Sequence, residues 1–147
     1  MKADHVLVPV DFSEPSRSAI RAAREIVADH GGRITLLHIG HVPYPQIDPT
    51  VYNVAGGVLL DISHRVAAAQ MARLEEWAEA ELPEVMEPTL LVREGPPWAE
   101  ILAQIEADSP DLVVMGTHGR TGFSHAFLGS VTERVLQRSP VPVLVVK

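Results

Sequence analysis

The chain has 147 residues, enough for one domain that buries its apolar core without disulfides, and it contains no cysteine, which excludes zinc or iron–sulfur sites built on thiolates. The formal net charge of -7 argues against a surface of clustered Lys and Arg, so we expect no nucleic-acid partner. The length predicts a single domain over residues 1–147. No stretch resembles a membrane span or a signal peptide, so we expect the protein to act in the cytoplasm and not at a membrane.

Short apolar runs alternate with longer amphipathic runs along the whole chain. The apolar runs predict strands over residues 5–10, 33–39, 88–93, 111–116 and 141–147. The amphipathic runs predict helices over residues 14–30, 59–82, 99–108 and 131–138. Strands separated by helices pair in parallel, so the predicted fold class is α/β: an open, doubly wound, five-stranded parallel sheet with helices on both faces. We expect the arginines of the first helix and the glutamates of the second to face solvent.

The connection over residues 40–57 holds three prolines, both tyrosines and no helical period. Long connections in compact domains are often binding loops or lids. A variable surface loop is an equally good interpretation, and the sequence leaves both open.

A glycine-rich stretch, "MGTHGRTGFSHAFLGS", follows the fourth predicted strand. In an open α/β sheet, ligands bind beyond the carboxyl ends of the strands, where successive connections leave in opposite directions. Glycine permits positive φ and lets a ligand approach without meeting a Cβ. The amides of Gly129, Ser130 and Val131, at the start of a helix, favour an anion such as phosphate. We therefore predict a phosphate site in this stretch.

Helix capping is the alternative explanation of the same residues. The segment "SVTE" is typical of a capping box, in which Ser130 caps the helix and Glu133 reaches back to the Ser130 amide. Capping does not explain the other glycines, nor a loop of about a dozen residues where such connections usually take about 2–6. A Walker P-loop would need a lysine after Gly129, and no dinucleotide-binding GxGxxG is present.

Five segments together resemble the universal stress protein family, specifically its nucleotide-binding branch: "VPVDFS", "LLHI", "VMGTHGRTG", "LGSVTERVL" and "PVLVV". The resemblance covers the full length of the chain. It implies a Rossmann-like fold of the adenine nucleotide alpha hydrolase type with strand order 3-2-1-4-5, and ATP as the ligand. This order agrees with the position of the glycine-rich stretch, because connections reverse between the first and fourth strands.

The resemblance also implies which residues contact the nucleotide. The matching positions are Pro9, Val10 and Asp11 near ribose and adenine, Ile39 beside the base, Met115, Gly116, His118 and Gly119 under ribose and phosphates, and Gly129, Ser130, Val131 and Thr132 around the phosphates. Asp11 has a second interpretation, in which it ends the first strand and Ser13 caps the following helix. We favour a ligand role for Asp11 because it lies at the expected edge of the crevice.

We predict no protein metal site and no catalytic residue. His38 and His41 lack a third ligand, so any divalent ion is expected to be Mg²⁺ bound through the phosphates. Rapid phosphoryl transfer needs cations on the developing charge and a group that positions the nucleophile, and the stretch offers only Arg120 and two histidines. We expect a nucleotide-dependent regulatory or stress-response module with at most slow ATP hydrolysis.

Two other classes of protein fit the fold less well. An adenylyl-transfer or nucleotide-hydrolysing enzyme would carry a signature such as H-x-G-H near the first strand, and the sequence has none there. A phospho-receiver domain would end its third strand in aspartate, whereas this chain has Arg93-Glu94-Gly95.

The last predicted strand lies at an edge of a sheet ordered 3-2-1-4-5. Residues 143–146 are uninterrupted and apolar, and such an edge pairs with another chain unless it is protected. We predict a homodimer formed edge to edge along residues 143–147, which is also the family's usual arrangement.

Overall fold

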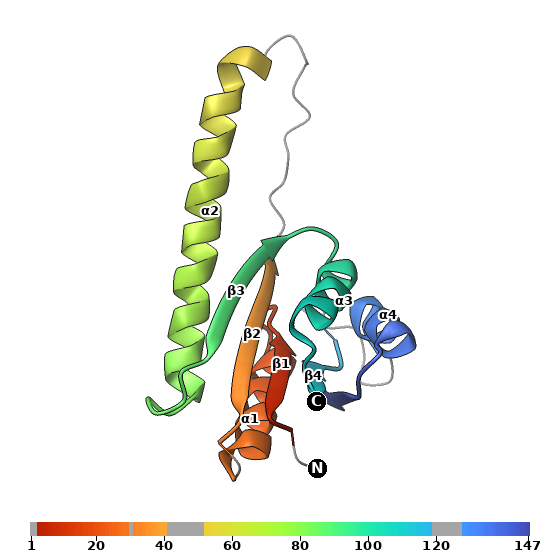
Figure 1. Ribbon diagram of the computed structural model, residues 1–147. Helices are drawn as coiled ribbons and strands as arrows, with labels where there is room; N and C mark the ends of the chain where they lie inside the picture. Colours follow the sequence, from red (N-terminus) through yellow and green to blue (C-terminus); the bar gives the residue numbers. More distant parts are fainter. Residues whose placement is uncertain (1–2, 30, 41–51, 119–127) are drawn as a thin grey trace.

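A computed structural model describes residues 3–29, 31–40, 52–118 and 128–147, with residues 52–60 described as helical backbone only. The elements in chain order are β1 (His5–Pro9), α1 (Glu14–Ala28), β2 (Arg33–Gly40), α2 (Tyr52–Glu81), β3 (Thr89–Glu94), α3 (Pro97–Asp108), β4 (Leu112–Gly116), α4 (Ser130–Arg138) and β5 (Val143–Val146) (Figure 1). No helix within these residues is long and apolar enough to cross a membrane.

The strands form one parallel sheet in the order β3-β2-β1-β4-β5, which confirms the predicted fold. Side chains from β1 alternate between two buried clusters. Val6 and Val8 pack with α1 and α2 on one face, and Leu7 packs with α3 and α4 on the other. Burial on both faces explains why the central strands are continuously apolar in sequence. The chain leaves β1 toward one face and β4 toward the other, so the connections diverge between β1 and β4.

Helix α2 begins earlier than predicted. It starts at Tyr52, and residues 52–57, which the sequence assigned to an irregular connection, are helical. The prediction was wrong because residues 52–57 show no helical period in sequence, yet they continue the helix through Gly56 and Gly57. A glycine inside a helix costs only about 1 kcal/mol relative to alanine, which a helix of 30 residues can tolerate. Residues 41–51 of the connection lie outside the described residues.

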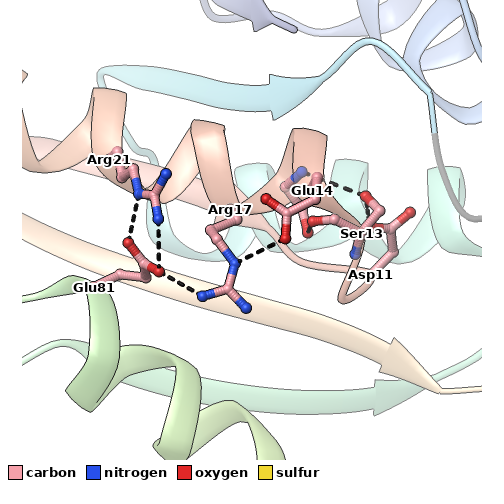
Figure 2. Close-up of polar contacts among 7 residues, drawn as sticks. Asp11, Ser13, Glu14, Arg17, Arg21 and Glu81 are labelled. Carbon is pink, nitrogen blue, oxygen red and sulfur yellow. Dashed lines mark hydrogen bonds and ion pairs between the residues drawn. The ribbon is translucent and has the colours of Figure 1, made fainter.

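The charge pattern predicted that Glu81 and the arginines of α1 face solvent. In the structure they instead contact one another. Glu81 is 6% exposed, and its carboxylate accepts hydrogen bonds from Arg17 Nη1 at 2.6 Å and Arg21 Nε at 2.7 Å (Figure 2). Arg24 Nη1 donates to the Glu81 carbonyl oxygen at 2.9 Å. The hydrogen bond from Arg21 holds the pKa of Glu81 below its usual value. The charges therefore join α1 to the last turn of α2, a contact between helices that a one-dimensional charge pattern does not reveal.

His5 lies buried at the start of β1 in a polar network. Its Nδ1 accepts a hydrogen bond from Arg33 Nη2 at 3.0 Å, which leaves Nε2 to donate to Thr35 Oγ1 at 2.9 Å. The carboxylate of Asp111 accepts from the amides of Asp4 and His5 at 2.9 and 2.8 Å. Burial, and then the nearby guanidinium of Arg33, lower the pKa of His5. The folded state therefore favours the neutral imidazole.

This lowered pKa predicts a loss of stability in mild acid. Below about pH 6.5, His5 takes up a proton more readily in the unfolded chain, so the free energy of unfolding falls from there to the lower pKa of the folded state. Above that pH, the stability is retained in full. We expect His5→Gln to reduce the pH dependence in this window, as measured by urea unfolding of both proteins between about pH 8 and pH 5. Equal slopes for the two proteins would contradict the prediction.

Candidate functional site

A pocket of about 250 Å³ opens at the carboxyl ends of β1 and β4, where the connections diverge. Its lining residues are Pro9, Val10, Asp11, Ser13, Ser16, Ile39, Pro97, Ile101, Met115, Gly116, His118, Gly129, Ser130, Val131 and Thr132. The volume is slightly below the usual range for ligand pockets, about 300–1,000 Å³.

The structure gathers the predicted site residues around this pocket. All of them line it except Gly119, which lies outside the described residues. Sequence reasoning missed Ser16 of α1 and Pro97 and Ile101 of α3, and it treated Ser13 only as a cap. The cap at Ser13 already implied that the start of α1 follows the pocket-lining segment. Nothing in the local sequence indicated that α3 reaches the same pocket.

The segment after β1 forms one wall of the pocket and is held by hydrogen bonds. Val10 donates its amide to the Leu37 carbonyl at 2.8 Å, and His38 Nδ1 donates to the Val10 carbonyl at 2.7 Å. The Asp11 carboxylate accepts from the Ser13 amide at 3.0 Å and from the Ser13 hydroxyl at 2.5 Å (Figure 2). Ser13 is also the N-cap of α1. Asp11 thus both orients the cap and lines the pocket, so the two interpretations of Asp11 are compatible.

Gly116 is required by packing and not by an unusual backbone angle. A Cβ at this position would lie 2.6 Å from Pro15 Cβ and 2.9 Å from the Pro15 carbonyl carbon. Among the described residues, the glycines with positive φ are Gly31 and Gly95, so Gly116 does not use the positive φ that glycine permits. The absence of a side chain at Gly116 lets α1 approach β4 closely, which places the start of α1 against the pocket.

The start of α4 also lines the pocket. Gly129 is the N-cap residue, with φ -64° and ψ 150° and no side-chain capping bond, and Ser130 is the first helical residue. The predicted capping box is therefore wrong, because the helix begins one residue earlier and the Gly129 carbonyl already accepts from the Glu133 amide at 2.9 Å. Gly129 does not use a positive φ either.

This helix start leaves donors available at the pocket. No hydrogen bond joins the amides of Ser130, Val131 or Thr132 to the described part of the chain. The Gly129 amide donates to the Thr117 carbonyl at 2.7 Å, and the Thr132 hydroxyl donates to the Gly116 carbonyl at 2.9 Å. These two bonds tie α4 to the end of β4. Free amides at the positive end of a helix dipole suit an anion.

The other side chains of the pocket separate into an apolar and a polar part. Val10, Ile39 and Met115 supply apolar surface near the sheet, whereas His118 adds a ring whose Nδ1 lies 2.9 Å from the Thr117 hydroxyl. Such a pocket can hold a flat apolar ring at one end and an anionic group at the other.

The described residues contain no group of three His, Asp or Glu side chains that could hold a metal ion. His38 is buried and uses Nδ1 to bind the Val10 carbonyl, whereas His41 lies outside the described residues.

Residues 2–147 match the family model of the universal stress protein family. Universal stress protein YxiE of Bacillus subtilis is 28% identical over 145 residues, covering 97% of this chain and 97% of its own. Universal stress protein MJ0577 of Methanocaldococcus jannaschii is 28% identical over 152 residues, covering 97% and 93%.

Solved structures show the same fold. The structure of MJ0577 matches with a TM-score of 0.82 and 24% identity, covering 100% of this chain and 97% of its own. A universal stress protein solved in complex with cAMP matches with a TM-score of 0.65 and 20% identity, covering 99% and 98%.

Proposed function

The chain belongs to the universal stress protein family, and from this premise we propose that it is a nucleotide-dependent regulatory module of the stress response that binds ATP. One observation carries the proposal: the start of α4 has no side-chain cap, its first amides bond no other described residue, and it lines a pocket that also contains the apolar side chains of Val10, Ile39 and Met115. A universal stress protein of this fold has been solved with cAMP, a phosphate-bearing adenine nucleotide. The cytoplasm, where ATP is abundant, is the compartment we propose.

Each part of ATP has a counterpart in the pocket. The adenine ring lies against Val10, Ile39 and Met115, and the Asp11 carboxylate accepts hydrogen bonds from the ribose hydroxyls. The phosphates receive hydrogen bonds from the amides of residues 130–132, and Mg²⁺ binds to the phosphate oxygens without a dedicated set of protein ligands. Because Ser13 fixes the carboxylate of Asp11 in advance, little ordering is needed at the ribose.

The direct test is to identify what the protein binds. We expect freshly purified protein, once denatured, to release an adenine nucleotide that mass spectrometry identifies, and nucleotide-free protein to give a calorimetric response to MgATP. Well-folded protein without either response would overturn the proposal. Phosphate release faster than about one per second, which is within the ordinary enzymatic range, would overturn a regulatory role in favour of an ATPase.

We also propose a homodimer formed along the free edge of β5. The carbonyls of Pro142 and Val146 accept from amides of the β4 side, so the polar groups of Val143 and Val145 point outward in a parallel ladder. Leu144 is 38% exposed on the same strand. An apolar edge with available backbone groups favours pairing with a second copy.

Pairing along the β5 edge predicts the mass of the protein in solution and how a substitution changes it. Light scattering should give twice the chain mass of 16.0 kDa at micromolar concentration. Val145→Pro removes an outward N–H while keeping the β4 ladder, so we expect it to give monomers with an unchanged circular dichroism spectrum. A wild-type monomer, or a Val145→Pro dimer, would contradict this interface.

A further inference from the structure

Phe12 has a backbone conformation that its side chain disfavours. Its φ is 64°, in the left-handed region, and it stands between Asp11, which lines the pocket, and Ser13, which caps α1. A bulky residue adopts this conformation only where the surrounding structure holds it there. Residues in disfavoured backbone conformations cluster at functional sites, where surrounding contacts hold them in place.

Aromatic and cationic groups from two elements hold the Phe12 ring. Its centroid lies 4.4 Å from the His38 ring of β2 and 5.4 Å from the Trp77 ring of α2, the latter edge to face. The guanidinium of Arg73, also on α2, lies 4.2 Å above the Phe12 ring. Arg17 of α1 in turn lies 4.2 Å above Trp77. Edge-to-face and cation–π contacts of this kind are directional and favour one ring position.

These contacts fix the chain on one side of Asp11, and hydrogen bonds fix it on the other. His38 both contacts the Phe12 ring and donates to the Val10 carbonyl, so one side chain supports the residues before and after Asp11. The carboxylate itself is oriented by Ser13.

We propose that Phe12 is a positioning residue for the nucleotide pocket: Trp77 of α2 and His38 of β2 lock its ring so that Asp11 stands at the rim. This inference rests on the proposed function. It extends the site to α2, which contributes no residue to the described lining of the pocket. A ring that merely filled space in the core would not require a residue in the left-handed region.

The test compares MgATP affinities by calorimetry. Trp77→Leu removes the ring edge from Phe12 without touching the pocket, and we expect the Kd to rise about tenfold, since small displacements of a binding group are costly. Trp77→Phe keeps an aromatic neighbour and should restore most of the affinity. Leu74→Val, in the same helix and fully buried but not among the ring contacts of Phe12, should lower the melting temperature and leave the Kd unchanged.

A second variant separates the ring from the backbone. Phe12→Gly accepts the left-handed conformation without strain but loses every ring contact. We expect it to weaken MgATP binding at least as much as Trp77→Leu. Wild-type affinity in Phe12→Gly would show that the backbone turn alone suffices and would overturn the inference.

Fluorescence supplies a readout that a purely structural role would not change. The chain has two tryptophans, so Trp98→Phe leaves Trp77 as the sole tryptophan, which can be excited selectively over the tyrosines. We expect MgATP to change Trp77 emission, with saturation at the calorimetric Kd. If wild-type protein binds no nucleotide, the proposed function fails. If it binds, but Trp77 emission stays constant and Trp77→Leu binds normally, only the positioning role fails.

Discussion

Ser130→Asp is expected to abolish MgATP binding while leaving the fold intact. The substitution places a carboxylate at the first residue of α4, beside the amides assigned to the phosphates. Two like charges about 4 Å apart repel by about 4 kcal/mol near a protein surface, so we expect the Kd to rise by at least about 100-fold. An acidic residue in the first turn of a helix is itself favourable by about 0.3–1 kcal/mol, so stability should not fall.

Three measurements separate charge from shape in this variant. Calorimetry with MgATP should show the loss, whereas adenosine, which has no phosphate, should bind Ser130→Asp and wild type alike. The neutral variant Ser130→Asn should retain most of the MgATP affinity. If Ser130→Asp binds MgATP normally, the phosphates do not lie at the start of α4.

Glu81→Gln is expected to lower the stability of the fold. It removes the carboxylate that accepts from Arg17 and Arg21 and leaves their charges beside a nearly buried neutral group. Removing one partner of a fully buried ion pair costs about 3–5 kcal/mol. The Arg17 and Arg21 side chains are 26% and 51% exposed, so solvent screens both charges and we expect a loss of only about 1–2 kcal/mol. For a chain of this size, that corresponds to a melting temperature lower by about 2–8 °C.

Thermal unfolding of wild type, Glu81→Gln and Glu79→Gln measures this effect. Glu79 lies on the same helix and is exposed, so its substitution should change the melting temperature little. Equal melting temperatures for the two variants would show that the contacts of Glu81 with α1 contribute no net stability.

The segments that line the pocket could be predicted from the sequence because the patterns that identify them are local. Short apolar runs separated by amphipathic runs are enough to predict a parallel sheet, since only strands buried on both faces lack polar positions. The glycine-rich stretch after β4 and Asp11 after β1 could be assigned to one site, because carboxyl ends of adjacent parallel strands meet at one edge.

The fold class followed from the pattern of apolar and amphipathic runs, whereas the strand order and most residues around the pocket followed from the resemblance to the family. Tertiary structure alone decided why Gly116 is a glycine, that Glu81 is buried, that Ile101 reaches the pocket and that Phe12 is held by Trp77. The physical reason is the range of the interactions. Strand and helix patterns arise between neighbours in the chain, whereas a steric contact with Pro15 or an ion pair between α1 and α2 exists only after distant segments have packed together.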